Sequence, residues 1–271
     1  MIGVEIVNML RRPRTWVTIL MLNALPALVA VLLALTDLGP RPGTGPPFLS
    51  AVLTDGTLFP LAALGIVLPL FLPVAVAVVA GDAIAGEAQT GTLRYLLIRP
   101  VGRTRLLVAK LVSVVVFVLI AVLIVAAAAY VEGRLLLGKG DPSGTVSSVS
   151  GTALSQTQMI QRTGLALAYV TLMMLGVAAI ALLLSTLTDS AISAALGTVA
   201  ILIGSTVLLG LDAAQALHPY LPTRYWLSFV DLFRDPIRWS GVLHGVASQF
   251  AYLVVFVGAA WANFSTKDIN S

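Results

Sequence analysis

The chain has 271 residues, of which 58% are hydrophobic and 10% are charged, and its formal net charge is +4. This apolar share indicates an integral membrane protein without a soluble domain of its own. The absence of cysteine excludes disulfides and sites built on thiolates. The small basic excess fits membrane topology and lipid headgroups better than nucleic-acid binding, which needs a basic face on a soluble scaffold.

Six apolar windows are long enough to cross a bilayer, because a spanning helix needs about 20 residues for a hydrocarbon core roughly 30 Å thick. The windows are Thr15–Leu35, Pro60–Ala80, Leu106–Tyr130, Leu165–Leu187, Ala191–Leu211 and Val242–Ala262. These continuous runs favour helices over the short alternating strands of a transmembrane barrel. We therefore expect an all-α integral membrane protein in which residues 1–271 form one transmembrane domain.

The segment 1–14 combines an apolar repeat at helical spacing with a basic flank. The residues concerned are Ile2, Ile6, Met9, Leu10, Arg11, Arg12 and Arg14. This pattern favours an amphipathic helix that lies in the headgroup plane before the first span. The alternative is that the segment simply extends the first span.

Basic residues close to the span ends gather on the side that holds both termini, as Arg11, Arg103 and Lys110 do. Lysine and arginine in short loops are retained in the cytoplasm. We therefore expect a multi-pass protein of the plasma membrane with both termini in the cytoplasm.

The second window contains Pro60, Pro69 and Pro73, and each proline removes a backbone hydrogen bond from a helix. We expect kinks there. The polar residues 81–90 should carry the helix out of the membrane until Gly91 interrupts it.

A short second helix is predicted directly after Gly91. Thr92 can cap it, and Leu93, Leu96 and Leu97 lie at positions i, i+3 and i+4, so that it has one apolar face. Pro100 ends it. Such a helix, connected to a span on each side, could dock a cytoplasmic partner. The alternative is that this segment is a basic loop that lies on anionic lipid.

The spacing of residues from Glu87 to Lys110 resembles the cytoplasmic loop signature of ATP-binding-cassette (ABC) exporter permeases of the type-two class. The resemblance implies a six-helix membrane subunit that pairs with a second copy or a homologue, and a coupling helix that docks on a separate ATPase. The docking residues it implies are Glu87, Gly91, Thr92, Leu93, Leu96, Leu97, Pro100 and Arg103. ATP and Mg would then be bound by the partner ATPase, and no cofactor by this chain. Gly102 and Gln89 depart from the usual pattern.

Ionisable residues are absent from the centres of the six windows, although ion-driven transporters need such groups at membrane depth. Asp82, Lys110, Asp212 and His244 lie near span ends, where snorkelling and headgroup contact would explain them. The energy for transport is then expected from a partner.

The later part of the chain offers two structural predictions. Thr188–Ser190 is so short that the fourth and fifth spans must be antiparallel neighbours. Small residues in the fifth span should allow another helix to approach closely. The aromatic segment Leu211–Gly241 suits the membrane interface, with a substrate gate as the alternative.

Together these features predict the permease subunit of an ABC exporter that moves a lipophilic drug, antibiotic or lipid out of the cytoplasm and is not itself an enzyme. One alternative is a non-transporting membrane anchor or assembly subunit. Another is an intramembrane lipid-modifying enzyme, although His218 and His244 belong to no recognisable catalytic pattern. The cargo, the residues that line its pathway, and the choice between homodimer and heterodimer stay open.

Overall fold

The computed structural model describes residues 2–36, 48–53, 55–91, 102–137, 146–147, 150 and 152–266. These residues are helical apart from one short antiparallel strand pair and connecting turns. The elements are α1 (Ile2–Arg11), α2 (Pro13–Thr36), η1 (Gly56–Leu58), α3 (Phe59–Val67), α4 (Phe71–Gln89), α6 (Arg103–Leu136), β1 (Val146–Ser147), β2 (Ala153–Leu154), α7 (Gln156–Leu187), α8 (Ala191–Leu209), η2 (Asp212–Tyr220), η3 (Trp226–Phe233) and α9 (Trp239–Thr266).

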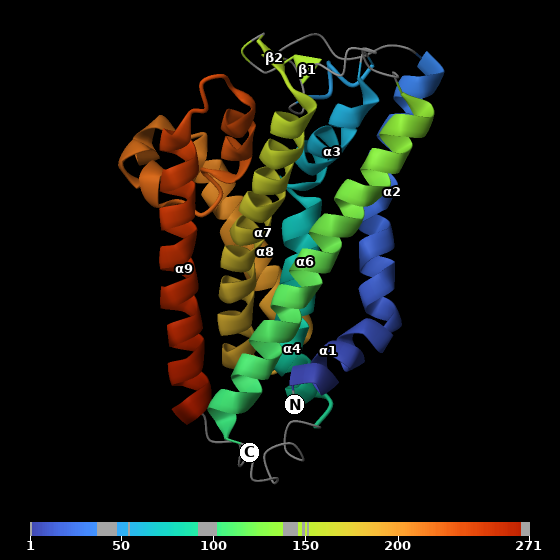
Figure 1. The fold of residues 1–271 in the computed structure, drawn as a ribbon. Helices are drawn as coiled ribbons and strands as arrows, with labels where there is room; N and C mark the ends of the chain where they lie inside the picture. The colour runs from blue at the N-terminus through green and yellow to red at the C-terminus, as the bar shows by residue number, and fades with distance from the viewer. Residues whose placement is uncertain are drawn as a thin grey trace.

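The long helices stand side by side in one bundle (Figure 1). Helix α1, the last turns of α4 and α9, and the first turns of α6 lie at one end, which we call the α1 end. The strand pair lies at the other end, together with η2 and η3. Helix α7 is central to the packing, because it contacts α4, α6, α8 and α9.

Six helices in the described part of the chain are long and apolar enough to cross a membrane: α2, α4, α6, α7, α8 and α9. Each overlaps one of the six predicted windows. Helices α6 and α7 contain 34 and 32 residues and are therefore longer than the windows that predicted them. Their polar ends continue the helix because backbone hydrogen bonds do not require apolar side chains.

The first segment forms a helix of its own, because the chain breaks at Arg12, where α1 has ended and α2 has not begun. Pro13 explains the break, since proline suits the first position of a helix and disfavours helical geometry in the residue before it. The Thr15 hydroxyl donates to the Met9 carbonyl at 2.7 Å and fixes the turn. Segment 1–14 is therefore not a simple extension of the first span.

The second window is interrupted, and the single kinked span predicted there was wrong. Helix α3 ends at Val67 and α4 starts at Phe71, with a turn between them. Pro69 and Pro73 account for the interruption, because neither can donate a backbone hydrogen bond and their rings crowd the preceding helical turn. Nearly all of α3 is buried. The spanning helix is consequently α4, which lies further along the chain than the window.

Helices α4, α7 and α8 approach closely through small side chains. A Cβ atom added to Gly81 of α4 would lie 3.0 Å from the backbone nitrogen of Ala195 in α8. The Ser185 hydroxyl of α7 donates to the Gly81 carbonyl at 2.7 Å and accepts from two backbone N–H groups of α4. Ala194 and Ala195 of the fifth span are thus buried within the chain, whereas Ser193 and Gly204 are exposed. The predicted antiparallel pairing of α7 with α8 is confirmed.

The aromatic segment between α8 and α9 folds into η2 and η3, whose larger rings are mostly inside the protein. Trp226, Phe229 and Phe233 are buried, and η3 packs on α7 and α9. The prediction that these residues anchor the chain at the membrane interface was wrong for them, because each ring packs against protein. Tyr220 is exposed and still fits that prediction.

Candidate functional site

The two helices that flank segment 92–101 have well-defined ends. Helix α4 stops at Gln89, as predicted, and Gly91 takes the positive φ of 70° that favours glycine. Helix α6 begins at Arg103 after Gly102. Of the residues to which docking was assigned, Glu87, Gly91 and Arg103 are described. Thr92, Leu93, Leu96, Leu97 and Pro100 lie outside the described residues.

Lys110 of α6 joins α1, α4 and α6 through its ammonium group. Nζ donates to Glu5 Oε2 of α1 at 2.8 Å and to Glu87 Oε1 of α4. The lysine is only 4% exposed. The expectation that Lys110 snorkels to the headgroups was therefore wrong, because α1 folds back and supplies a carboxylate inside the protein.

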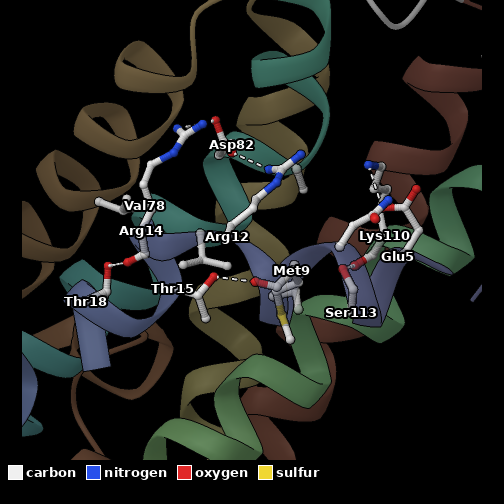
Figure 2. A pocket seen from close by; sticks show the side chains of 14 residues that line it. Glu5, Met9, Arg12, Arg14, Thr15, Thr18, Val78, Asp82, Lys110 and Ser113 are labelled. Atoms are coloured by element: carbon white, nitrogen blue, oxygen red, sulfur yellow. Dashed lines mark hydrogen bonds and ion pairs between the residues drawn. The ribbon is translucent and has the colours of Figure 1, made fainter. Parts of the chain in front are cut away.

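Asp82 of α4 forms a second group of ion pairs beside the first (Figure 2). Its Oδ2 accepts from Arg12 Nη1 at 2.9 Å, and its Oδ1 lies 3.5 Å from Arg14 Nη1. Headgroup contact was therefore an incomplete explanation of Asp82, since the arginines at the α1–α2 junction already bind it.

The two groups differ in burial and in net charge. Lys110 is paired with two carboxylates, and this half carries a net charge of −1. Asp82 is paired with two arginines, and this half carries +1. Removing one partner from a buried ion pair leaves an uncompensated charge, whereas exposed pairs contribute about 1 kcal/mol or less. Lys110 is therefore the structural centre of the cluster, and the arginine half is its accessible part.

Arg103 and Thr104 tie the start of α6 to the end of α9. Arg103 Nη1 donates to the Ser265 carbonyl at 2.9 Å, and Trp261 Nε1 donates to Thr104 Oγ1 at 2.9 Å. Arg103, assigned to partner docking from the sequence, therefore also has a contact within the chain. The end of the last span is thereby fixed to the start of α6.

Glu5 is the functional candidate that sequence reasoning missed. It lies between Ile2, Ile6 and Met9 on the helical face that repeats at i, i+3, i+4 and i+7. An acid on the apolar face of an amphipathic helix must be paired when that face is buried. Its partner Lys110 is 105 positions away, so the sequence indicates the need for a base but not its identity.

The histidines bind backbone carbonyl groups. His218 Nε2 lies 3.0 Å from the Leu208 carbonyl, and His244 Nδ1 lies 2.6 Å from the Ser240 carbonyl. Within the described ranges, no three His, Cys, Asp or Glu side chains are grouped so that they could hold a metal ion.

The helices define a multi-pass membrane protein with a charged cluster at one end of the bundle. The chain belongs to the family described as "Protein of unknown function (DUF2705)", which matches residues 43–270. The match extends from before η1 through α9, and α1 and α2 precede it. No curated protein matches the sequence.

Proposed function

We propose that the chain is the membrane-spanning permease subunit of an ABC exporter, powered by a separate cytoplasmic ATPase that docks on segment 92–101. The single observation that carries this proposal is the Glu87–Lys110 ion pair, which joins the last turn of α4 to α6, the two helices on either side of that segment. The ends of the predicted docking segment thus belong to one connected unit. A force applied to it acts on both helices together.

The contacts define a route for such a force into the bundle. Glu5 extends the Lys110 connection to α1, and Ser185 connects α4 to α7. Arg103 connects the start of α6 to α9. Closure of an ATPase dimer against segment 92–101 would therefore move a set of helices rather than one loop.

The remaining parts of the proposal follow from the resemblance and the charge pattern. ATP and Mg are bound by the partner, a second permease copy or homologue completes the pathway, and both termini lie in the cytoplasm. The cargo is a lipophilic drug, an antibiotic or a lipid. In this arrangement the docking surface comprises Glu87, Gly91, Thr92, Leu93, Leu96, Leu97, Pro100 and Arg103.

The test compares two Leu→Asp variants, one in segment 92–101 and one near the far end of α6. Leu96→Asp changes the proposed docking segment, whereas Leu135→Asp changes a side chain that is 77% exposed near the far end of the helix. Each tagged chain is purified from native membranes in mild detergent, the co-purifying proteins are identified by mass spectrometry, and ATP hydrolysis is measured.

We expect an ATPase to co-purify with the unchanged chain and with Leu135→Asp, and to be lost with Leu96→Asp. A chain that purifies without any ATPase would refute the docking proposal. An ATPase that stays bound while no cargo is transported would support the anchor or assembly subunit instead.

A further inference from the structure

A crevice opens at the α1 end between the α1–α2 junction and α4. It is lined by Arg12 and Arg14 on one side and by Asp82 and Val78 on the other. Figure 2 shows both arginine side chains directed towards Asp82. The Arg14 side chain is 77% exposed and the Arg12 side chain is 45% exposed, so ligands outside the protein can reach both guanidinium groups.

The arginine side of the crevice favours an anion with a single negative charge, whereas Glu5 and Lys110, which also line it, are paired with each other. Two guanidinium groups share the Asp82 carboxylate, so one positive charge stays uncompensated within this group. Arg12 Nη1 lies 2.9 Å from Asp82 Oδ2, whereas Arg14 Nη1 lies 3.5 Å from Asp82 Oδ1. Since a guanidinium has five N–H donors, Arg14 retains donors for an additional acceptor.

The lining also favours a ligand with an apolar part. Val78, Val79 and Val114 line the crevice beside the charged residues. Val78 is 46% exposed and therefore faces the surroundings of the bundle. The first helix long enough to span begins at Pro13, between the two arginines. In a bilayer crossed from Pro13 onward, the guanidinium groups would lie at headgroup level and the valines at acyl-chain level.

We infer that this crevice binds an anionic phospholipid from the surrounding leaflet. Arg12 and Arg14 hold the monoanionic phosphodiester, and Val78 contacts the first carbons of an acyl chain. Basic pockets between membrane helices bind anionic headgroups in this way. The inference stands apart from the proposed transport function, because neither the ATPase nor segment 92–101 takes part in it.

Native mass spectrometry of the full chain in detergent tests the inference. The protein is titrated with phosphatidylglycerol, with phosphatidylcholine, and with glycerol 3-phosphate as a soluble phosphate. The variants are Arg14→Gln and Arg11→Gln. Both remove one exposed arginine at the α1 end, but Arg11 does not line the crevice and serves as the matched control.

We expect phosphatidylglycerol to bind more tightly than phosphatidylcholine, and Arg14→Gln to weaken it about fivefold while Arg11→Gln has little effect. The variant Asp82→Asn should bind phosphatidylglycerol more tightly, because it removes a carboxylate that competes with the lipid phosphate. If Asp82 had only a structural role, the Asp82→Asn variant would not bind the lipid more tightly. Gel filtration of each variant checks that it is folded.

Three results would overturn the inference. Equal losses in Arg14→Gln and Arg11→Gln would indicate diffuse surface charge instead of a site. Unchanged binding in Arg14→Gln would place the lipid elsewhere. Glycerol 3-phosphate that binds as tightly as the lipid would show a soluble phosphate ligand, with no contribution from the apolar wall.

Discussion

Gly176 of α7 and the side chain of Gln249 of α9 occupy one shared space between their helices. A Cβ atom added to Gly176 would lie 1.8 Å from Gln249 Oε1. Gln249 is 1% exposed, and its Nε2 donates to the Pro222 carbonyl at 2.8 Å. The glycine thus leaves room for a buried carboxamide that connects α9 to the segment between η2 and η3.

Gly176→Ala should destabilise the protein by about 1–3 kcal/mol, because the added methyl group must displace the Gln249 carboxamide. Gly164→Ala is the matched control on the same helix, since a Cβ there meets no atom within 4 Å. Thermal unfolding in detergent should show a lower midpoint for Gly176→Ala only. Equal midpoints for the two variants would contradict the packing described.

Ser185→Ala should loosen the contact of α7 with α4 and cost about 1 kcal/mol, because hydrogen bonds between membrane helices contribute that much. The hydroxyl donates one hydrogen bond to the α4 backbone and accepts two from it. Ser193→Ala removes an exposed hydroxyl in α8 and should leave the unfolding midpoint unchanged. If both variants unfold alike, Ser185 does not carry the connection.

Lys110→Met should destabilise the protein by about 3–5 kcal/mol, because it leaves the Glu5 and Glu87 carboxylates close together and without their shared cation. Arg105→Met, which changes an exposed base five residues earlier in α6, is the control. The free energies of unfolding of the two variants are compared by chemical denaturation in detergent.

A second variant of Lys110 separates the effect of charge from the effect of shape. The double variant Lys110→Met with Glu87→Gln removes one of the two carboxylate charges that repel each other, so it should regain part of the lost stability. A double variant that is less stable than Lys110→Met would contradict the ion-pair explanation.

Tyr169→Phe should weaken the attachment of the segment before η3 by about 1 kcal/mol. The Tyr169 hydroxyl donates to the Tyr225 carbonyl at 2.7 Å. Amide hydrogen exchange across residues 221–233 should become faster in this variant. Tyr220→Phe changes an exposed ring and should leave the exchange unchanged. A uniform increase over the whole chain would indicate general destabilisation instead.

Local features of the fold could be predicted from the sequence. Apolar runs located the helices because their length is set by the thickness of a bilayer. The end of α4 at Gln89 followed from Gly91, and the turn between α7 and α8 followed from its shortness. In each case the cause lies within a few residues of the effect.

The candidate site could be predicted only in part, because its pairs are distant in the chain. Lys110 is 105 positions from Glu5, and Arg12 is 70 positions from Asp82. Pattern analysis placed Lys110 and Asp82 near span ends but could not show that α1 folds back onto Lys110 or that the arginines at the α1–α2 junction bind Asp82. The interior position of Trp226 and Phe229 was missed for the same reason, since aromatic residues suit a membrane interface and a packed core equally.

The interruption between α3 and α4 has a consequence for how the protein is assembled. Helix α3 has 9 residues and rises about 14 Å, which is too short to cross a bilayer as an independent insertion unit. Its apolar residues are covered by α2 and α6, and α6 follows it in the chain. Because α6 is synthesised after α3, the apolar surface of α3 is fully covered only once α6 is in place. Its position is set afterwards, when α6 enters the membrane and packs against it.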